Sequence, residues 1–222
     1  GGYTEGLFGV GGWPVYLTAY LLFVGLHLYG VGEALTAMFV VTALAVLALV
    51  VFVVAMIPHF DIANLFDIPP TDAVGASKFL PNGYLGIWAA IPYAIWFFLA
   101  IEGVPLAAEE TADPEKNLPR GLIAGMLVLL VFAATILLVG PGGAGSSTIQ
   151  SSDNPLPTAL QAPTAYGGPS GISRFVAFVG LAGLIASFFS IIFAYSRQIF
   201  ALSRAGYLPR VLSLTSRRKT PF

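Results

Sequence analysis

The sequence predicts an all-α integral membrane protein, and two observations lead to that fold class. Of the 222 residues, 57% are hydrophobic and only 9% are charged, and the mean hydropathy is +0.84. A water-soluble domain carries about 25% charged residues, so this chain lacks the polar residues that would cover a surface in water. The apolar residues also fall into runs of about 20, which is the length of helix that crosses a bilayer.

Five such runs are expected to form one transmembrane domain. The second run is free of charged residues, and the third carries a single acid, Glu102. Polar connections separate the runs, with a Gly/Ser/Pro-rich stretch at 141–171 expected to be a long loop. The odd number of spans, with glycine at position 1, indicates a fragment of a longer protein. The predicted spans are 13–32, 34–57, 79–108, 120–140 and 173–196.

The placement of Lys and Arg predicts the orientation in the cell (plasma or inner) membrane. Arg197, Arg204, Arg210, Arg217, Arg218 and Lys219 follow the fifth span, and Lys116 and Arg120 lie between the third and fourth. The positive-inside rule therefore places loops 109–120 and 197–222 in the cytoplasm. Apolar residues alternate with the arginines of the last loop, a pattern that also fits a helix lying on the membrane surface.

The third span is expected to break near 100–105. Pro105 lacks a backbone N–H and clashes with the carbonyl of Ile101, and Glu102 and Gly103 lie beside it. In lipid, freed carbonyls and an acid are tolerated only where they line a cavity or are buried in protein. The break therefore predicts a transport site.

The chemistry at the break suits an organic amine. The carbonyls that end the first half-helix form a partial negative pole, and an ionised Glu102 adds a full charge. Aromatic faces just before the break can hold an ammonium group by cation–π attraction worth about 0.5–2 kcal/mol. The alternatives are that the aromatic residues only pack and that Glu102 is structural. The candidate substrate-binding residues are Trp96, Phe97, Phe98, Leu99, Ala100 and Glu102, with Glu102 also the candidate gate or proton acceptor.

Three weaker candidates lie elsewhere. Ser187 and Ser190 share one helix face and could line a pathway or coordinate an ion, although serine bonding to its own helix is the alternative. His27 lies in a span without acidic neighbours and is expected to be a packed polar residue. His59 and Asp61 begin a loop and are expected to be solvated, not to bind metal.

Several classes of function are disfavoured. A net charge of −1 gives no reason to expect nucleic acid as a partner. The chain has no cysteine, which excludes thiolate metal sites and cysteine nucleophiles. Glu102 has no second titratable or nucleophilic partner near it in the sequence, so an enzyme is not expected. No metal and no cofactor are predicted.

The residues around the break resemble a family signature. Glu102-Gly103, Ala107 to Glu110, Asp113-Pro114, Asn117 and Pro119-Arg120 resemble the sixth helix and following loop of the amino acid–polyamine–organocation permeases. Within that superfamily, IWFFLAIEGVPLAAEE (95–110) and FAYSRQIFALSRAGYLPR (193–210) are similar to the ethanolamine permease branch. The resemblance covers essentially the whole chain.

This resemblance implies a fold and a set of site positions. The fold is a twelve-helix, five-plus-five inverted-repeat (LeuT-like) transporter with a discontinuous sixth helix, of which this chain covers about helices 4 to 8. Trp96, Phe97, Leu99 and Ala100 match substrate-contact positions of the sixth helix, and Glu102 matches its acidic gate. Ser187 and Ser190 fall on the eighth helix, where sodium-coupled relatives place ion ligands.

Two departures leave the coupling ion open between H⁺ and Na⁺. The span 34–57 lacks the lysine that some proton-coupled relatives carry in the fifth helix, and Ala100 stands where many relatives have glycine.

The main hypothesis is a secondary active transporter that imports a small organic amine by alternating access, with ethanolamine as the favoured substrate. An amino acid permease of the same superfamily and a non-translocating membrane sensor are the alternatives. The expected partners are the amine and the lipid bilayer.

Overall fold

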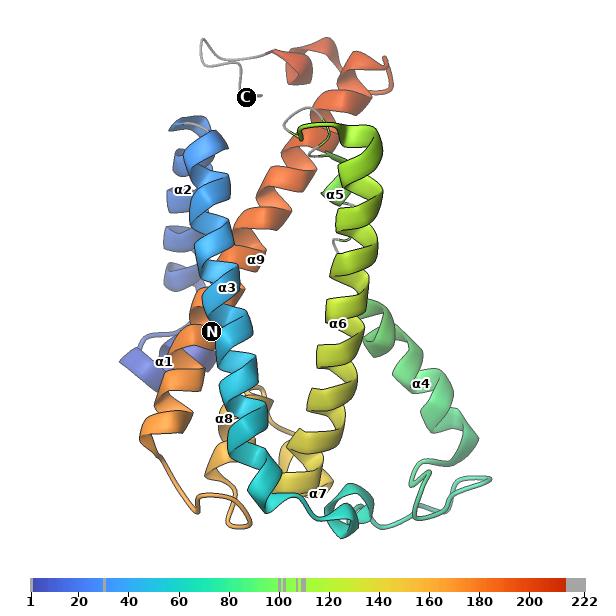
Figure 1. The fold of residues 1–222 in the computed structure, drawn as a ribbon. Helices are drawn as coiled ribbons and strands as arrows, with labels where there is room; N and C mark the ends of the chain where they lie inside the picture. The colour runs from blue at the N-terminus through green and yellow to red at the C-terminus, as the bar shows by residue number, and fades with distance from the viewer. Residues whose placement is uncertain are drawn as a thin grey trace. The chain divides into compact units, whose positions relative to one another are not determined.

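The computed structural model describes residues 2–29, 31–99, 101, 103–106, 108 and 111–214, and the regular structure in these residues is helical (Figure 1). Within them, three helices are long and apolar enough to cross a membrane: Phe39–His59, Pro114–Ala144 and Gly171–Arg204. The α-helices are α1 (Gly2–Phe8), α2 (Trp13–Tyr29), α3 (Val31–Met56), α4 (Gly83–Trp96), α5 (Gly103–Leu106), α6 (Pro114–Ala144), α7 (Ser146–Ile149), α8 (Pro155–Gln161) and α9 (Gly171–Arg204). The 3₁₀ turns are η1 (Ile57–His59), η2 (Ile62–Phe66) and η4 (Arg210–Ser213).

The helix α6 begins inside the segment that was expected to be a cytoplasmic loop. Asp113 precedes it, and its carbonyl accepts hydrogen bonds from the N–H groups of Lys116 and Asn117, each at 3.0 Å. Pro114 occupies the first helical position, where its missing N–H costs no hydrogen bond, and Glu115 complements the positive end of the helix. The polar residues 114–120 are therefore the first turns of α6.

The stretch 141–171 is not the long loop that its composition predicts. The helix α6 continues to Ala144, and α7 and α8 follow. Gly140, Gly142, Gly143 and Ala144 are buried, and a Cβ built on Gly143 would lie 2.5 Å from the Cε atom of Met56. Close packing against α3 and η1 thus outweighs the poor helix propensity of glycine.

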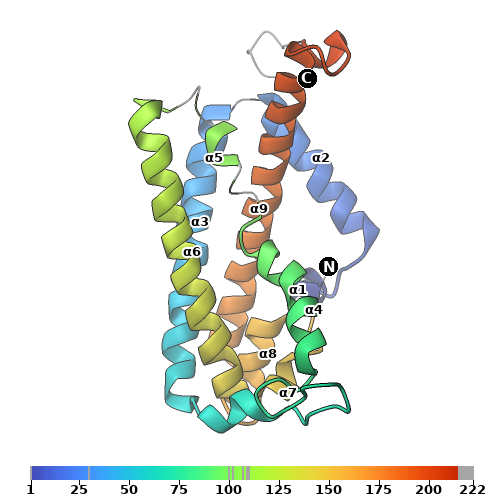
Figure 2. The ribbon, with the colours of Figure 1, turned by 90° about the vertical axis from the view of Figure 1, so that its right-hand side faces the viewer.

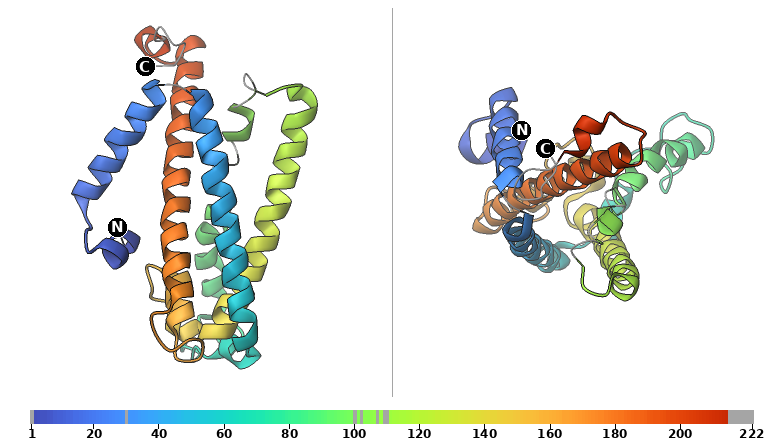
Figure 3. Two further views of the ribbon diagram at one scale, coloured as in Figure 1. Left: turned by 60° about the vertical axis from the view of Figure 1, so that its left-hand side comes forward. Right: turned by 90° about the horizontal axis from the view of Figure 1, so that it is seen from above.

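The chain divides into two compact units, of which the first comprises Gly1–Val46, Ala100–Leu122 and Gly180–Phe222. In this unit, α3 and α9 lie side by side (Figure 3). A Cβ built on Gly183 of α9 would lie 3.2 Å from the Cβ of Ala45 in α3. Tyr20 of α2 contacts Phe188 of α9, with 6.2 Å between ring centroids. Small residues that allow close helix approach are characteristic of helix packing in membranes.

The second unit comprises Leu47–Leu99 and Ile123–Val179 and holds the buried core. The core forms where the end of α3 meets the end of α6, α8 and the start of α9 (Figure 1). Phe52, Met56 and Leu160 are fully buried there. The other members of the core are Ala55, Ala144, Ala159, Ala162 and Val176.

Hydrogen bonds join the loop after α3 to the end of α6. The Gly142 carbonyl accepts from the Asp61 N–H at 2.9 Å and from the Asn64 side-chain amide at 2.8 Å. Asp61 is exposed and also accepts from the Ala63 N–H at 2.9 Å, which begins η2. His59 is not simply solvated, as was expected, because its ring packs edge-on against Tyr166 at 4.9 Å.

Candidate functional site

The helix α4 ends earlier than the sequence predicts. Its last residue is Trp96, and the N–H groups of Phe97, Phe98 and Leu99 bond to the carbonyls three residues before them, at 3.3, 3.0 and 3.3 Å. These 3₁₀-type bonds tighten the end of the helix. The carbonyls offered to a cation are therefore those of the turn 97–99, which follows the helix.

Pro105 does not break the helix by clashing with Ile101. It lies in the first turn of α5, where the Val104 N–H bonds to the Ile101 carbonyl at 3.2 Å. A proline in a first helical turn removes no helical hydrogen bond, since those N–H groups have no partner within the helix. The helix thus ends at Trp96 and a helix begins again at Gly103, so the interruption precedes Pro105 and overlaps the predicted position near 100–105.

The aromatic candidates lie on an open surface of the second unit. Trp96 is 70% exposed, Phe97 and Leu99 are exposed, and Phe98 is half-buried. In α4 the only buried residue is Gly83, and the helix stands apart from its neighbours in that unit (Figures 1 and 2). The side chains that were expected to contact an amine are therefore accessible.

Ala100 and Glu102 lie outside the described residues, so the gate at Glu102 stays a prediction. The described residues that follow them, Ile101 and Gly103–Leu106, belong to the first unit. There, a Cβ built on Gly103 would lie 3.7 Å from the Cβ of Ala194. The start of α5 is therefore packed against α9 through small residues.

The two serines of α9 lie in the first unit, and the aromatic candidates 96–99 lie in the second. Ser190 is half-buried, and its hydroxyl donates to the Ala186 carbonyl at 2.9 Å, within its own helix. Ser187 is exposed. For Ser190 the structure thus has the local hydrogen bond that the sequence analysis named as the alternative to ion coordination. The side chain of His27 lies outside the described part of the chain.

Sequence reasoning did not find a groove along one face of α4. Its volume is about 390 Å³, and it is mostly apolar in its lining. Its lining residues recur every three to four positions, and this helical spacing is the sequence signal that could have predicted the groove. Among the described residues, no group of three or more His, Asp or Glu side chains could hold a metal ion. The groove is lined by Asn82, Leu85, Gly86, Ala89, Ala90 and Tyr93.

Comparison with known proteins decides the family. The family model described as "Amino acid permease" matches residues 3–222. The chain belongs to the amino acid permease family. This amino acid permease chain is accordingly a multi-pass membrane protein, and the relatives with printed functions are permeases and transporters, not enzymes.

The permease chain is similar to several curated transporters. An uncharacterised transporter of Rhizobium meliloti (strain 1021) is 32% identical over 206 residues, 92% of this chain and 42% of the relative. The branched-chain amino acid permease BcaP of Lactococcus lactis is 28% identical over 82% of this chain and 38% of the relative. The D-serine/D-alanine/glycine transporter of Escherichia coli (strain CFT073) is 27% identical over 96% and 45%. No solved structure matches the chain. The permease chain thus spans less than half the length of each of these relatives.

Proposed function

We propose that the full-length protein is a secondary active transporter that imports a small organic amine by alternating access. The proposed substrate is ethanolamine, and its ammonium group binds at the turn that follows α4. The single observation that carries this proposal is the interruption of a helix after Trp96 in a chain of a membrane transporter family. Interrupted helices in membrane transporters place backbone carbonyls where substrates and ions bind.

The residues at the turn support an ammonium ligand. The α4 helix ends there with its partial negative pole, and Trp96 and Phe97 leave part of their rings exposed beside it. Exposed aromatic faces next to a negative helix end combine cation–π and dipole attraction for the same cation. Glu102 is six residues beyond Trp96, and we propose it as the gate or the proton acceptor in coupling to H⁺ or Na⁺.

Neutral amino acids are the second candidate substrates. They carry the same ammonium group, and the printed names of two relatives refer to branched-chain amino acids and to D-serine, D-alanine and glycine. An amino acid needs a second, anion-binding pole for its carboxylate, whereas ethanolamine offers a hydroxyl instead. Competition between the two classes therefore separates these candidates.

The test is uptake of radiolabelled ethanolamine into proteoliposomes that contain the full-length protein. Unlabelled ethanolamine and a panel of neutral amino acids compete, and Glu102→Gln and Glu115→Gln are assayed in parallel. Glu115 lies in the polar first turn of α6, so its variant is the matched control for loss of one carboxylate. We expect ethanolamine alone to compete and Glu102→Gln alone to abolish uptake.

Other outcomes contradict particular parts of the proposal. Competition by neutral amino acids at equal or lower concentration would replace ethanolamine with an amino acid substrate. Normal uptake by Glu102→Gln would make this acid structural. Saturable ethanolamine binding without flux into the liposomes would identify a sensor with a permease fold, and would overturn the transport proposal.

A further inference from the structure

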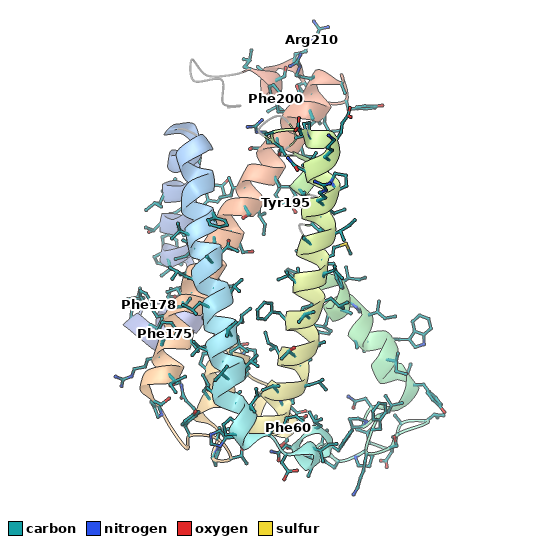
Figure 4. The ribbon with its side chains drawn as sticks, in the orientation of Figure 1. Phe60, Phe175, Phe178, Tyr195, Phe200 and Arg210 are labelled. Carbon is teal, nitrogen blue, oxygen red and sulfur yellow. The ribbon has the colours of Figure 1, made fainter. Side chains whose placement is uncertain are left out.

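The segment after α9 combines exposed apolar side chains with arginines. We define the α9 turn as residues 205–214, which lie in the first unit. Tyr207 is 81% exposed, Val211 is 66% exposed and Leu214 is 55% exposed. Arg204 and Arg210 are exposed beside them, and Arg210 points away from α9 (Figure 4). Exposed apolar side chains beside arginines are the pattern of a segment that lies at a membrane surface.

Hydrogen bonds hold the α9 turn in one shape. The hydroxyl of Ser203, which is buried, donates to the Pro209 carbonyl at 2.7 Å. The N–H groups of Gly206 and Tyr207 bond to the carbonyls of Ser203 and Leu202, at 3.1 and 3.0 Å. Gly206 has φ +86°, a conformation that glycine adopts at no steric cost. The apolar and basic side chains are therefore presented by an ordered turn.

The charge of this region has one sign. No Asp or Glu occurs in the sequence after Asp153, while Arg197, Arg204 and Arg210 are followed by Arg217, Arg218 and Lys219. The Arg204 guanidinium lies 5.8 Å from the centre of the Phe200 ring, so its apolar stem and charge are both placed at the end of the helix. An anionic surface is the complementary partner.

We propose that the α9 turn is an interfacial anchor that binds anionic phospholipid head groups at the end of the α9 span. Tyr207, Val211 and Leu214 insert among the head groups, and Arg204 and Arg210 bind their phosphates. The turn directly follows α9, which is long and apolar enough to cross a membrane, so the proposal places the turn at one surface of the bilayer. Each basic side chain near an anionic leaflet favours the bound state by roughly fivefold. This anchor goes beyond amine transport and does not depend on the substrate.

The chain offers a clean way to test the anchor, because it contains no cysteine. A nitroxide attached to Val211→Cys reports depth through its collision rates with oxygen, which partitions into lipid, and with a water-soluble nickel chelate. The full chain is measured in nanodiscs of phosphatidylcholine alone or mixed with phosphatidylglycerol. We expect phosphatidylglycerol to raise the oxygen collision rate and to lower that of the chelate severalfold, and high salt to weaken this shift.

Two sets of variants distinguish charge from shape. Arg204→Gln with Arg210→Gln, in the Val211→Cys chain, is expected to remove the dependence on phosphatidylglycerol. The matched Arg204→Lys with Arg210→Lys chain keeps the charges and is expected to retain most of the shift. A nitroxide at Val74→Cys, which is 84% exposed in the loop that also carries Asp67 and Asp72, is the control site and should not respond.

Three results would overturn the proposal. Equal collision rates in both lipid compositions would mean that anionic head groups do not bind the turn. An unchanged response in the glutamine variant would mean that Arg204 and Arg210 are not the ligands. A label that becomes shielded only as the protein-to-lipid ratio rises would mean that a second copy of the chain covers the turn.

Discussion

The carboxylate of Asp67 accepts two hydrogen bonds from Ser147, which lies 80 residues further along the chain. The Ser147 N–H donates to Oδ1 at 3.0 Å, and the Ser147 hydroxyl donates to Oδ2 at 2.6 Å. Gly145 has φ +90°, and a Cβ built on it would lie 2.7 Å from the same carboxylate. The side chain of Asp67 therefore joins the loop after η2 to the start of α7, at the point where α6 ends.

Replacing Asp67 with alanine should destabilise the second unit. Both hydrogen bonds to a charged group are lost, which we expect to lower the free energy of unfolding by about 1–3 kcal/mol. Ser147→Ala keeps the backbone N–H donor and should cost about half as much. Thermal unfolding of the protein in detergent, followed by tryptophan fluorescence, measures both. Asp72→Ala removes a charge from the same loop and is the control; an equal loss in this variant would mean that net charge, not the Asp67–Ser147 pair, matters.

At Gly83, the start of α4 contacts the loop that precedes this helix. It has φ +60°, its N–H bonds to the Leu80 carbonyl at 2.9 Å, and a Cβ built on it would collide with the Val74 carbonyl oxygen. That carbonyl also accepts from the Tyr84 N–H at 3.2 Å. We expect Gly83→Ala to lower the free energy of unfolding by about 2–3 kcal/mol, since neither the backbone atom nor the φ angle can adjust cheaply.

Gly121→Ala is the matched control for this prediction. Gly121 lies inside α6, and a Cβ built on it meets nothing within 4 Å. The added methyl should stabilise the helix by about 0.5–1 kcal/mol. Equal unfolding midpoints for the Gly83 and Gly121 variants would contradict the close contact with Val74.

The long helices could be predicted from the sequence because their cause is local. A run of apolar residues matches the bilayer thickness whatever lies beside it, and α3, α6 and α9 contain such runs. The helical end of α6 could not be predicted, since Gly142 and Gly143 are held by Phe60 and Met56, which come from a distant part of the chain. Local propensity alone favours a loop there.

The exact position of the helix interruption is also not determined by the local sequence. Proline disrupts a helix interior but is tolerated in a first turn, and the sequence around Pro105 does not distinguish the two. The structure has Pro105 in the first turn of α5, so the interruption precedes it. Trp96 to Leu99 could be proposed as substrate contacts from their type and proximity to the break. The α4 groove was missed because Gly86, Ala89 and Ala90 carry no chemistry that marks them.

Ser190→Ala should change transport little. The Ser190 hydroxyl donates its proton to the Ala186 carbonyl within its own helix, and we predict that it serves this local bond and not a coupling ion. We expect the ion concentration for half-maximal uptake to stay within about twofold of the wild-type value. Ser187, exposed and nearly one helical turn away, is the informative partner, and Ser187→Ala should shift that concentration if the α9 hydroxyls line the pathway. A tenfold shift for Ser190→Ala would contradict this prediction and would show that the Ser190 oxygen, whose lone pairs stay free in this hydrogen bond, binds the ion.

Trp96 and Trp88 allow a matched test of the proposed amine contact. Both are in α4, and they are 70% and 72% exposed, so they differ mainly in distance from the turn after the helix. If the Trp96 ring holds an ammonium group, Trp96→Leu loses a cation–π attraction of about 0.5–2 kcal/mol, and KM for the amine should rise about 2- to 30-fold. Trp88→Leu removes as much aromatic surface and should leave KM unchanged. A similar rise in both variants would point to a general effect on α4, and no rise in either would remove Trp96 from the binding site.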